Sequence, residues 1–120
     1  MVTIARAELG DDVLTDHRRL AEAVAEPARQ EEGADVYPGL VPKAAALLLV
    51  MLRLRPFARA NAKVSLLATT VFLNRNGLDL QAVGDELIAV VAVAATGELS
   101  VHETAAALEG FVVRLTQPME

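Results

Sequence analysis

The segment Leu40 to Leu54 constrains the fold of this chain most, because it is apolar on nearly every side of a helix. A helix of that kind must be covered all round, so the pattern predicts a buried central helix. Pro42 fits its first turn, where a missing N–H costs little. Pro56 ends the helix near Leu54, because the residue before a proline avoids helical angles. We expect the rest of the chain to pack around this helix.

The residues before the central helix predict one helix and one polar connection. Residues 2–9 fit either a short edge strand or a frayed helical turn. Asp16 is a suitable N-cap for a helix that runs to about Glu26. Pro27 either ends that helix or begins a new turn. Residues 28–39 are polar and predict a loop or a short helix that leads into a turn.

The residues after the central helix predict three more helices. The first begins near Ala60, ends at Asn76 and is closed by Gly77. The second runs from Asp85 to Ala95, and the third from about Val101 to Leu115 after a capping box at Ser100 to Glu103. The expected inner face of the first comprises Val64, Leu67, Ala68, Val71 and Phe72.

Length and composition agree with an all-α domain. The chain has 120 residues, which is enough for a single domain over residues 1–120. Hydrophobic residues make up 53% of it, yet it has only three Phe and one Tyr. Small and aliphatic side chains of this kind favour close contacts between helices. The expected fold class is therefore all-α, a bundle of about five to six helices.

The sequence also carries expectations about location. It contains no cysteine, which suits a reducing compartment. No long apolar core typical of a signal peptide occurs in residues 1–12. The longest uncharged apolar run, Ala44 to Leu52, is far below the roughly 20 residues that a membrane span needs. We expect a cytoplasmic protein with no membrane association, and no motif points to nucleic acid.

The charges are divided unevenly along the chain. The net charge is −5, but residues 36–78 contain no acidic residue. One interpretation is a set of solvated cations at helix ends. The other is an anion site centred on the turn 53–63, because a loop that leads into a helix offers backbone N–H groups and the positive end of the helix dipole. The cations of this block are Lys43, Arg53, Arg55, Arg59, Lys63 and Arg75.

The turn also carries a motif. Arg55 to Lys63 reads Arg-Pro-Phe-Ala-Arg-Ala-Asn-Ala-Lys and lies between two expected buried helices. This order resembles the Fic/Doc family, and the death-on-curing toxin branch in particular. The family motif is His-x-Phe-x-acidic-small-Asn-(Lys or Gly)-Arg. The segments Val71 to Gly77 and Val93 to Ser100 also resemble that branch, and Leu20 to Val24 does so more weakly. The resemblance spans about residues 14–115 and implies a Fic/Doc-like helical bundle.

In Fic proteins the motif turn wraps the phosphates of a nucleotide. The His is the general base for a target hydroxyl, the acidic residue helps to hold Mg²⁺, and the Asn and the last Arg bind phosphate oxygens. Most members transfer AMP from ATP to a protein hydroxyl, whereas Doc transfers a phosphate and is paired with an antitoxin. The resemblance thus implies ATP or another phosphate-bearing ligand, and an antitoxin-like or other protein partner.

Two of the chemical roles are missing from this sequence. Arg55 stands at the position of the family His, and a guanidinium stays protonated and cannot act as a general base. Arg59 replaces the acidic residue, and a cation there repels Mg²⁺, so we do not expect the metal. Phe57, Ala60 and Asn61 match the motif, and Lys63 keeps the charge of the last Arg but not its bidentate geometry. No residue is assigned as catalytic. The expected phosphate or nucleotide-binding residues are Arg55, Arg59, Asn61 and Lys63, and Phe57 is expected to anchor the loop.

Three functions fit these residues. The first is a degenerate, catalytically impaired Fic/Doc domain, a pseudoenzyme that binds an anion and acts through a partner or ligand. The second is a still-active transferase of the toxin–antitoxin type that moves a phosphate or nucleotidyl group to a protein or small-molecule hydroxyl. It must explain Arg55, and an arginine in the turn could replace the charge of the metal directly. The third is a helical interaction module without a ligand.

Other polar residues suggest no chemistry. His17 and His102 are expected on helix surfaces, and neither has the spacing of a metal site. The pairs Asp11-Asp12 and Glu31-Glu32 are expected as solvated loop charges, and Tyr37 as a loop anchor.

Overall fold

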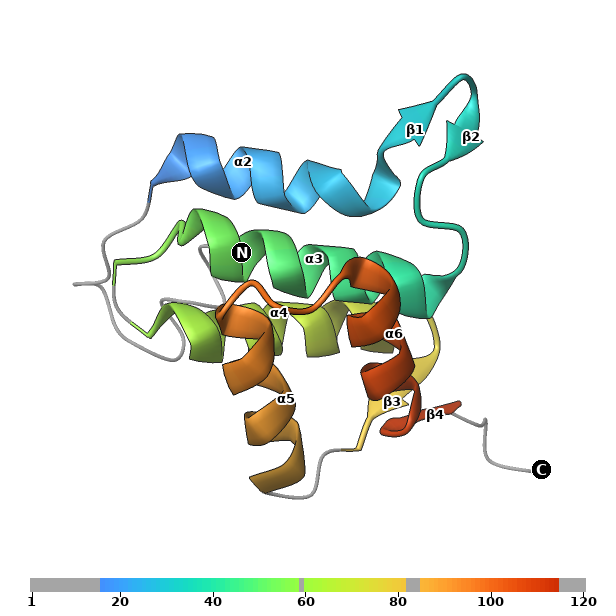
Figure 1. The fold of residues 1–120 in the computed structure, drawn as a ribbon. Coiled ribbons are helices and arrows are strands. Elements are labelled where there is room, and N and C mark those ends of the chain that lie inside the picture. Colours follow the sequence, from blue (N-terminus) through green and yellow to red (C-terminus); the bar gives the residue numbers. More distant parts are fainter. Residues whose placement is uncertain (1–15, 59, 82–84, 115–120) are drawn as a thin grey trace.

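The computed structural model of this chain describes residues 16–58, 60–81 and 85–114. The expectations for residues 2–9, for Asp11-Asp12 and for Arg59 lie outside the described residues. The described residues form five α-helices, one 3-10 helix and two short antiparallel strand pairs, which confirms the all-α fold class (Figure 1). In chain order the elements are α2 (His17–Ala25), η1 (Glu26–Ala28), β1 (Gln30–Glu31), β2 (Ala34–Asp35), α3 (Leu40–Leu54), α4 (Asn61–Arg75), β3 (Leu78–Leu80), α5 (Asp85–Ala95), α6 (Val101–Glu109) and β4 (Val112–Arg114).

Helix α3 is the centre of the structure, as its sequence predicts. It has exactly the expected bounds, and it contacts α2, η1, α4, α5 and α6. One core cluster joins α3 to α4, α5 and α6, with Leu48 and Leu108 fully buried in it. The second joins α3 to α2 and α4 around Met51 and Phe57. The apolar surface of α3 is thus divided between two cores.

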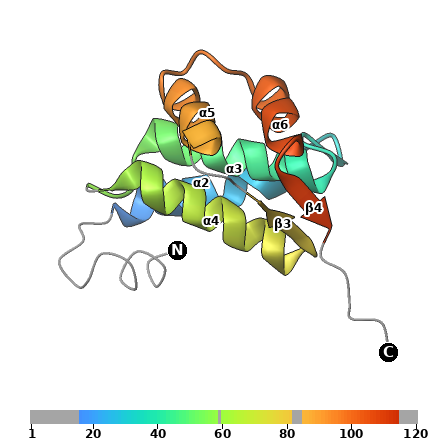
Figure 2. The ribbon, with the colours of Figure 1, turned by 90° about the horizontal axis from the view of Figure 1, so that it is seen from below.

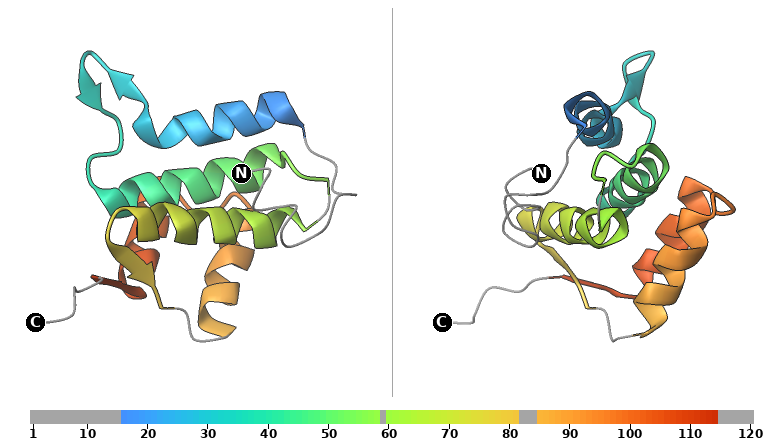
Figure 3. Two further views of the ribbon diagram at one scale, coloured as in Figure 1. Left: turned by 180° about the vertical axis from the view of Figure 1, so that it is seen from behind. Right: turned by 90° about the vertical axis from the view of Figure 1, so that its left-hand side faces the viewer.

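The helices form two sets. Helices α2, α3 and α4 lie roughly along one direction, with α3 between the other two (Figure 3). Helices α5 and α6 run across that direction and cover the face of α3 that lies away from α2 (Figure 2). Among the described residues, no helix combines the length and the apolar character that crossing a membrane would require.

Two predicted helix starts are confirmed by their caps. The Asp16 side chain accepts a hydrogen bond from the Arg19 N–H at 3.0 Å, so α2 begins where expected. At α6 the Ser100 hydroxyl accepts from the Glu103 N–H at 3.1 Å, and the Glu103 carboxylate accepts from the Ser100 N–H at 3.0 Å. This is a complete capping box.

The inner face of α4 differs from the prediction. Val64 and Ala68 are buried, but Leu67 and Val71 are only half-buried. The face against α3 contains Ser65 and Thr69, which are fully buried. Polar side chains can occupy it because each hydroxyl donates to the carbonyl four residues earlier, so no polar group is left unpaired on burial. These bonds join Ser65 Oγ to Asn61 O at 2.6 Å and Thr69 Oγ1 to Ser65 O at 2.9 Å.

The prediction that the last helix continues to Leu115 is wrong. Helix α6 ends at Glu109, and Gly110 follows it as the C-cap. The Phe111 N–H then donates to Leu108 O at 2.8 Å, and β4 pairs with β3, aligning Leu80 with Val112. β-Branched valines favour a strand over a helix, and Gly110 weakens the helix just before them.

A hairpin occupies the segment that was expected to be a loop or short helix. Strands β1 and β2 pair Gln30 with Asp35 on either side of a two-residue turn. Both turn residues, Glu32 and Gly33, have positive φ, at 52° and 80°. A turn of this kind matches the twist of an antiparallel hairpin. All four strand residues are exposed, so the sequence has no alternating apolar pattern that would predict the hairpin.

Candidate functional site

The turn between α3 and α4 is held from inside by Phe57. This side chain is completely buried, and it packs with α2, α3 and α4 in the second core cluster. Pro56 beside it is buried as well. The expectation that Phe57 anchors the loop agrees with this geometry. The backbone turns sharply on either side, because Arg55 and Ala60 both have left-handed conformations, with φ of 50° and 52°.

Asn61 holds the same turn through its side chain. Its amide nitrogen donates to Met51 O at 2.9 Å, and its amide oxygen accepts from the Phe57 N–H at 3.2 Å. The residue is only 4% exposed. The sequence suggested Asn61 as a ligand for phosphate, but here both polar ends of its side chain have partners within the chain. Its geometry is therefore that of a positioning residue for the turn.

The start of α2 adds two contacts to the turn. The Asp16 N–H donates to Pro56 O at 2.6 Å, and the Arg19 guanidinium donates to Leu54 O at 3.3 Å. Arg19 also forms an ion pair with Asp16 at 3.5 Å. Carbonyl groups at the end of a helix lack intrahelical partners, so Arg19 satisfies one that α3 leaves open at Leu54, while Asp16 satisfies a carbonyl of the turn itself. Nothing in the sequence spacing indicated that α2 would supply them.

The expected cations fall at different places around the turn. Arg55 is exposed at the end of α3, and Lys63 is exposed in the first turn of α4. Arg59 lies outside the described residues. Ala60 precedes α4, and its methyl side chain forms no capping bond, unlike the side chains that cap α2 and α6. The structure therefore brings two exposed cations to the two helix ends that flank the turn.

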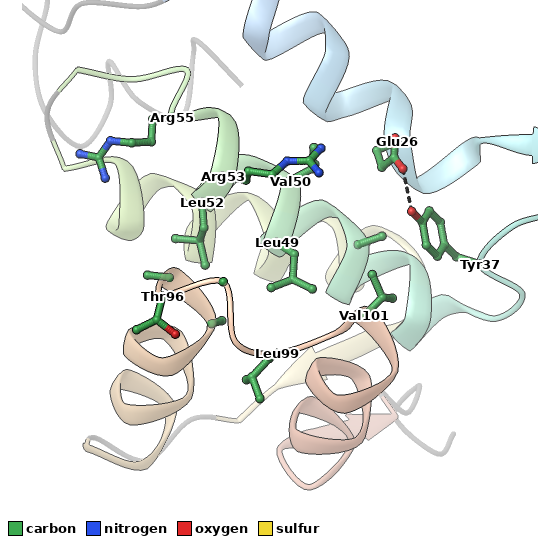
Figure 4. A pocket seen from close by; sticks show the side chains of 14 residues that line it. Glu26, Tyr37, Leu49, Val50, Leu52, Arg53, Arg55, Thr96, Leu99 and Val101 are labelled. Carbon is green, nitrogen blue, oxygen red and sulfur yellow. Dashed lines mark hydrogen bonds between the residues drawn. The ribbon is translucent and has the colours of Figure 1, made fainter.

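A pocket of about 540 Å³ lies beside the turn, along α3. One wall comes from α3 and the other from the end of α5 and the loop to α6 (Figure 4). Arg55 and Arg53 lie along its upper edge, and Glu26 and Tyr37 at its far end. Arg53 is not among the site residues expected from the sequence; its signals are its membership of the basic block and its place at the start of the turn 53–63. The apolar lining includes Leu49, Leu52, Leu99 and Val101.

The far end of the pocket is a hydrogen-bonded cluster. The Tyr37 hydroxyl donates to Glu26 Oε1 at 2.6 Å, and Arg29 contacts the same carboxylate oxygen at 3.3 Å. Arg29 also donates to the Tyr37 hydroxyl at 3.3 Å. Burial, and then the hydrogen bond to Glu26, raises the pKa of Tyr37 above its ordinary value. Tyr37 thus joins the hairpin segment to η1, which agrees with its expected role as a loop anchor.

The remaining polar candidates lie apart from this region. His17 and His102 are exposed in the first turns of α2 and α6, and Glu31 and Glu32 are exposed in the hairpin. Within the described residues, no group of three or more His, Cys, Asp or Glu side chains could hold a metal ion.

The chain was compared with protein families, curated proteins and solved structures. No family model, no curated protein and no solved structure matches the chain.

Proposed function

We propose that this chain is a degenerate Fic/Doc-type domain, catalytically impaired, whose basic turn binds an anion or a phosphate-bearing ligand. It acts through that ligand or through a protein partner of the antitoxin type. The proposal rests on the motif residues 55–63, on their position between two buried helices, and on the geometry of the turn.

The observation that carries the proposal is the backbone of the turn. Arg55 and Ala60 both adopt a left-handed conformation that costs a non-glycine residue about 1–2 kcal/mol. Such conformations persist where the surroundings impose them, and they gather at functional sites. Here Phe57 and Asn61 fix the turn between these two residues to the core. Backbone strain that persists at this turn supports a ligand role for the exposed Arg55, which is one of the two strained residues.

Impaired catalysis follows from the same residue. A general base must accept a proton at working pH, and the guanidinium of Arg55 cannot. Its exposed position leaves it solvated and charged, which suits attraction of a phosphate. Because Arg59 replaces the acidic residue that would help to hold the metal, the ligand we propose is bound without Mg²⁺. We further propose a cytoplasmic location, in line with a phosphate ligand and with a sequence that lacks cysteine.

Thermal unfolding tests the proposal. Inorganic phosphate, AMP, ADP and ATP are added at millimolar concentration, with and without Mg²⁺. At least one should raise the melting temperature by mass action, and added salt should reduce the shift. The shift should shrink in Arg55→Ala and Lys63→Ala. It should persist in Arg18→Ala and Arg75→Ala, which lie in α2 and at the end of α4.

Two outcomes would count against it. If none of the four anions changes the melting temperature, an interaction module without a ligand explains the chain better. If the shift strictly requires Mg²⁺, the expectation that Arg59 makes the metal dispensable fails. Asn61→Ala is unsuitable as the diagnostic variant, because this side chain also holds the turn.

A further inference from the structure

The pocket along α3 has the size and lining of a small-molecule site. Its volume of about 540 Å³ lies in the range of ligand pockets, roughly 300–1,000 Å³. Apolar side chains come from both walls, with Leu49 and Leu52 from α3 and Leu99 and Val101 from the opposite side. The close-up shows Leu49, Leu99 and Val101 around one space (Figure 4). This part of the lining can receive the apolar body of a ligand, and the polar lining residues leave room for a head group.

The charged groups around the pocket do not cancel. Glu26 is the one carboxylate among the lining residues, and it is already engaged by Arg29 and by the Tyr37 hydroxyl. Arg53 and Arg55 also line the pocket. Within residues 16–58, 60–81 and 85–114, the ion pairs involve Arg19, Arg29 and Lys43, and neither Arg53 nor Arg55 takes part in one. The pocket therefore keeps a positive charge at its edge.

The two arginines do not converge on one ligand group. Figure 4 shows the Arg53 side chain extending along the pocket toward the end occupied by Glu26 and Tyr37. The Arg55 side chain extends the opposite way, toward the turn. Only Arg53 is therefore placed to receive a head group of a ligand whose body lies in the pocket. A single guanidinium fork can pair with one carboxylate through two parallel hydrogen bonds.

We propose that this pocket binds an amphipathic monocarboxylate, with its apolar body between α3 and the α5–α6 loop and its carboxylate on Arg53. The pocket adjoins the basic turn, and Arg55 lines it too, but the proposed carboxylate site uses Arg53 and does not depend on the proposed function. Phosphate binding at the turn requires Arg55 and Lys63, whereas carboxylate binding in the pocket requires Arg53 and an apolar chain.

Calorimetric titration with octanoate, below its micellar concentration, tests the site. Butyrate and 1-octanol are the comparison ligands, the first lacking chain length and the second lacking charge. Each methylene that enters the apolar lining should strengthen binding by about fourfold, so octanoate should bind far more tightly than butyrate. Loss of the carboxylate in 1-octanol should weaken binding by about tenfold.

Two variants and two matched controls locate the site. Arg53→Gln removes the charge and should weaken octanoate about tenfold while leaving 1-octanol unchanged. Ala95→Trp places a large side chain at an exposed position that lines the pocket, and should weaken both ligands. Arg75→Gln and Ala92→Trp make the same changes at exposed positions outside the lining, and should alter neither affinity.

The proposal is overturned if octanoate gives no saturable binding at millimolar concentration. It is also overturned if 1-octanol binds as tightly as octanoate, or if the two control variants weaken binding as much as Arg53→Gln and Ala95→Trp do. Because Arg53 and Ala95 are both exposed, their variants should fold, and unchanged melting temperatures in the absence of ligand would verify this.

Discussion

The side-chain amide of Asn61 donates to the backbone carbonyl of Met51 at 2.9 Å, across the turn that joins α4 to α3. The same carbonyl accepts a hydrogen bond from the Arg55 N–H at 3.0 Å. One oxygen therefore accepts from the residue that ends α3 and from the residue that begins α4. A carbonyl has two lone pairs, and both are used here. The ends of the two helices are thereby fixed to one atom.

Replacement of Asn61 should therefore destabilise the protein through the turn. In Asn61→Ala the buried Phe57 N–H loses its acceptor, which should cost about 1–3 kcal/mol in the free energy of unfolding. Asn61→Asp keeps an acceptor for Phe57 but loses the donor to Met51 O. Chemical denaturation measures both. Unfolding free energies equal to that of the native chain would show that the amide does not hold the turn.

Phe57 should be the most costly side chain of the turn to truncate. Phe57→Ala removes a completely buried ring from the second core cluster, and should lower the free energy of unfolding by about 3–5 kcal/mol. Phe111→Ala is the matched control, because Phe111 is only half-buried and lies outside that cluster. It should cost less, and a loss of under about 1 kcal/mol for Phe57→Ala would contradict the anchoring role.

Replacement of Ala60 by glycine should stabilise the protein, although replacing alanine by glycine usually destabilises one. Its φ of 52° is unfavourable for any side chain, so Ala60→Gly should relieve strain of about 1–2 kcal/mol. The greater flexibility of glycine in the unfolded chain reduces this stabilisation by roughly 0.5–1 kcal/mol. Ala106→Gly, at an exposed position in α6, should only destabilise. Equal losses of unfolding free energy in the two variants would refute the strain.

Glu103 should make stability depend on pH. Hydrogen bonds from the backbone N–H and then the side chain of Ser100 hold its pKa below its ordinary value in the folded protein. A depressed folded pKa contributes stability above the unfolded pKa, and this is lost as pH falls through the folded value. The melting temperature of the native chain should therefore exceed that of Glu103→Ala at pH 6–7, and the two should approach each other below about pH 4. A difference that persists in acid would contradict this assignment.

Transferase activity should be very low, and replacing two arginines should raise it. With labelled ATP, Mg²⁺ and a cell lysate, the native chain should modify little protein, because Arg55 cannot accept a proton. Arg55→His combined with Arg59→Asp should increase labelling if the rest of the turn can still hold a nucleotide, and Arg55→His alone should do so less. Strong labelling by the native chain that Lys63→Ala abolishes would favour an active transferase.

The helices could be predicted from the sequence where local signals agree. The apolar run of α3 and Pro56 give its exact bounds, and Asp16 and Ser100 mark helix starts. The two strand pairs could not be predicted in this way. Residues of β1 and β2 are exposed and lack an apolar pattern, and β4 depends on a partner 32 to 36 residues away, Leu78–Leu80.

The candidate site was likewise predictable only in part from the sequence. Phe57 was expected to anchor the loop from the resemblance, and it is buried. The bonds of Asn61 and the contribution of α2 could not be foreseen, because they depend on how close separate helices come. The same applies to Arg53, which becomes a site residue only once the α5–α6 loop lies opposite it.

The small buried surface of helix α5 should let this helix open locally. Its buried side chains are Leu87, Val91 and Ala94, a single narrow row, while Ile88 is 62% exposed. A helix with so little buried surface should open at a free energy well below that of global unfolding, so its amides should exchange hydrogen sooner than those of α3. Since the last residues of α5 form part of the pocket wall, each such opening would also widen the entrance for a ligand. Slower exchange in α5 when octanoate is bound would report this coupling.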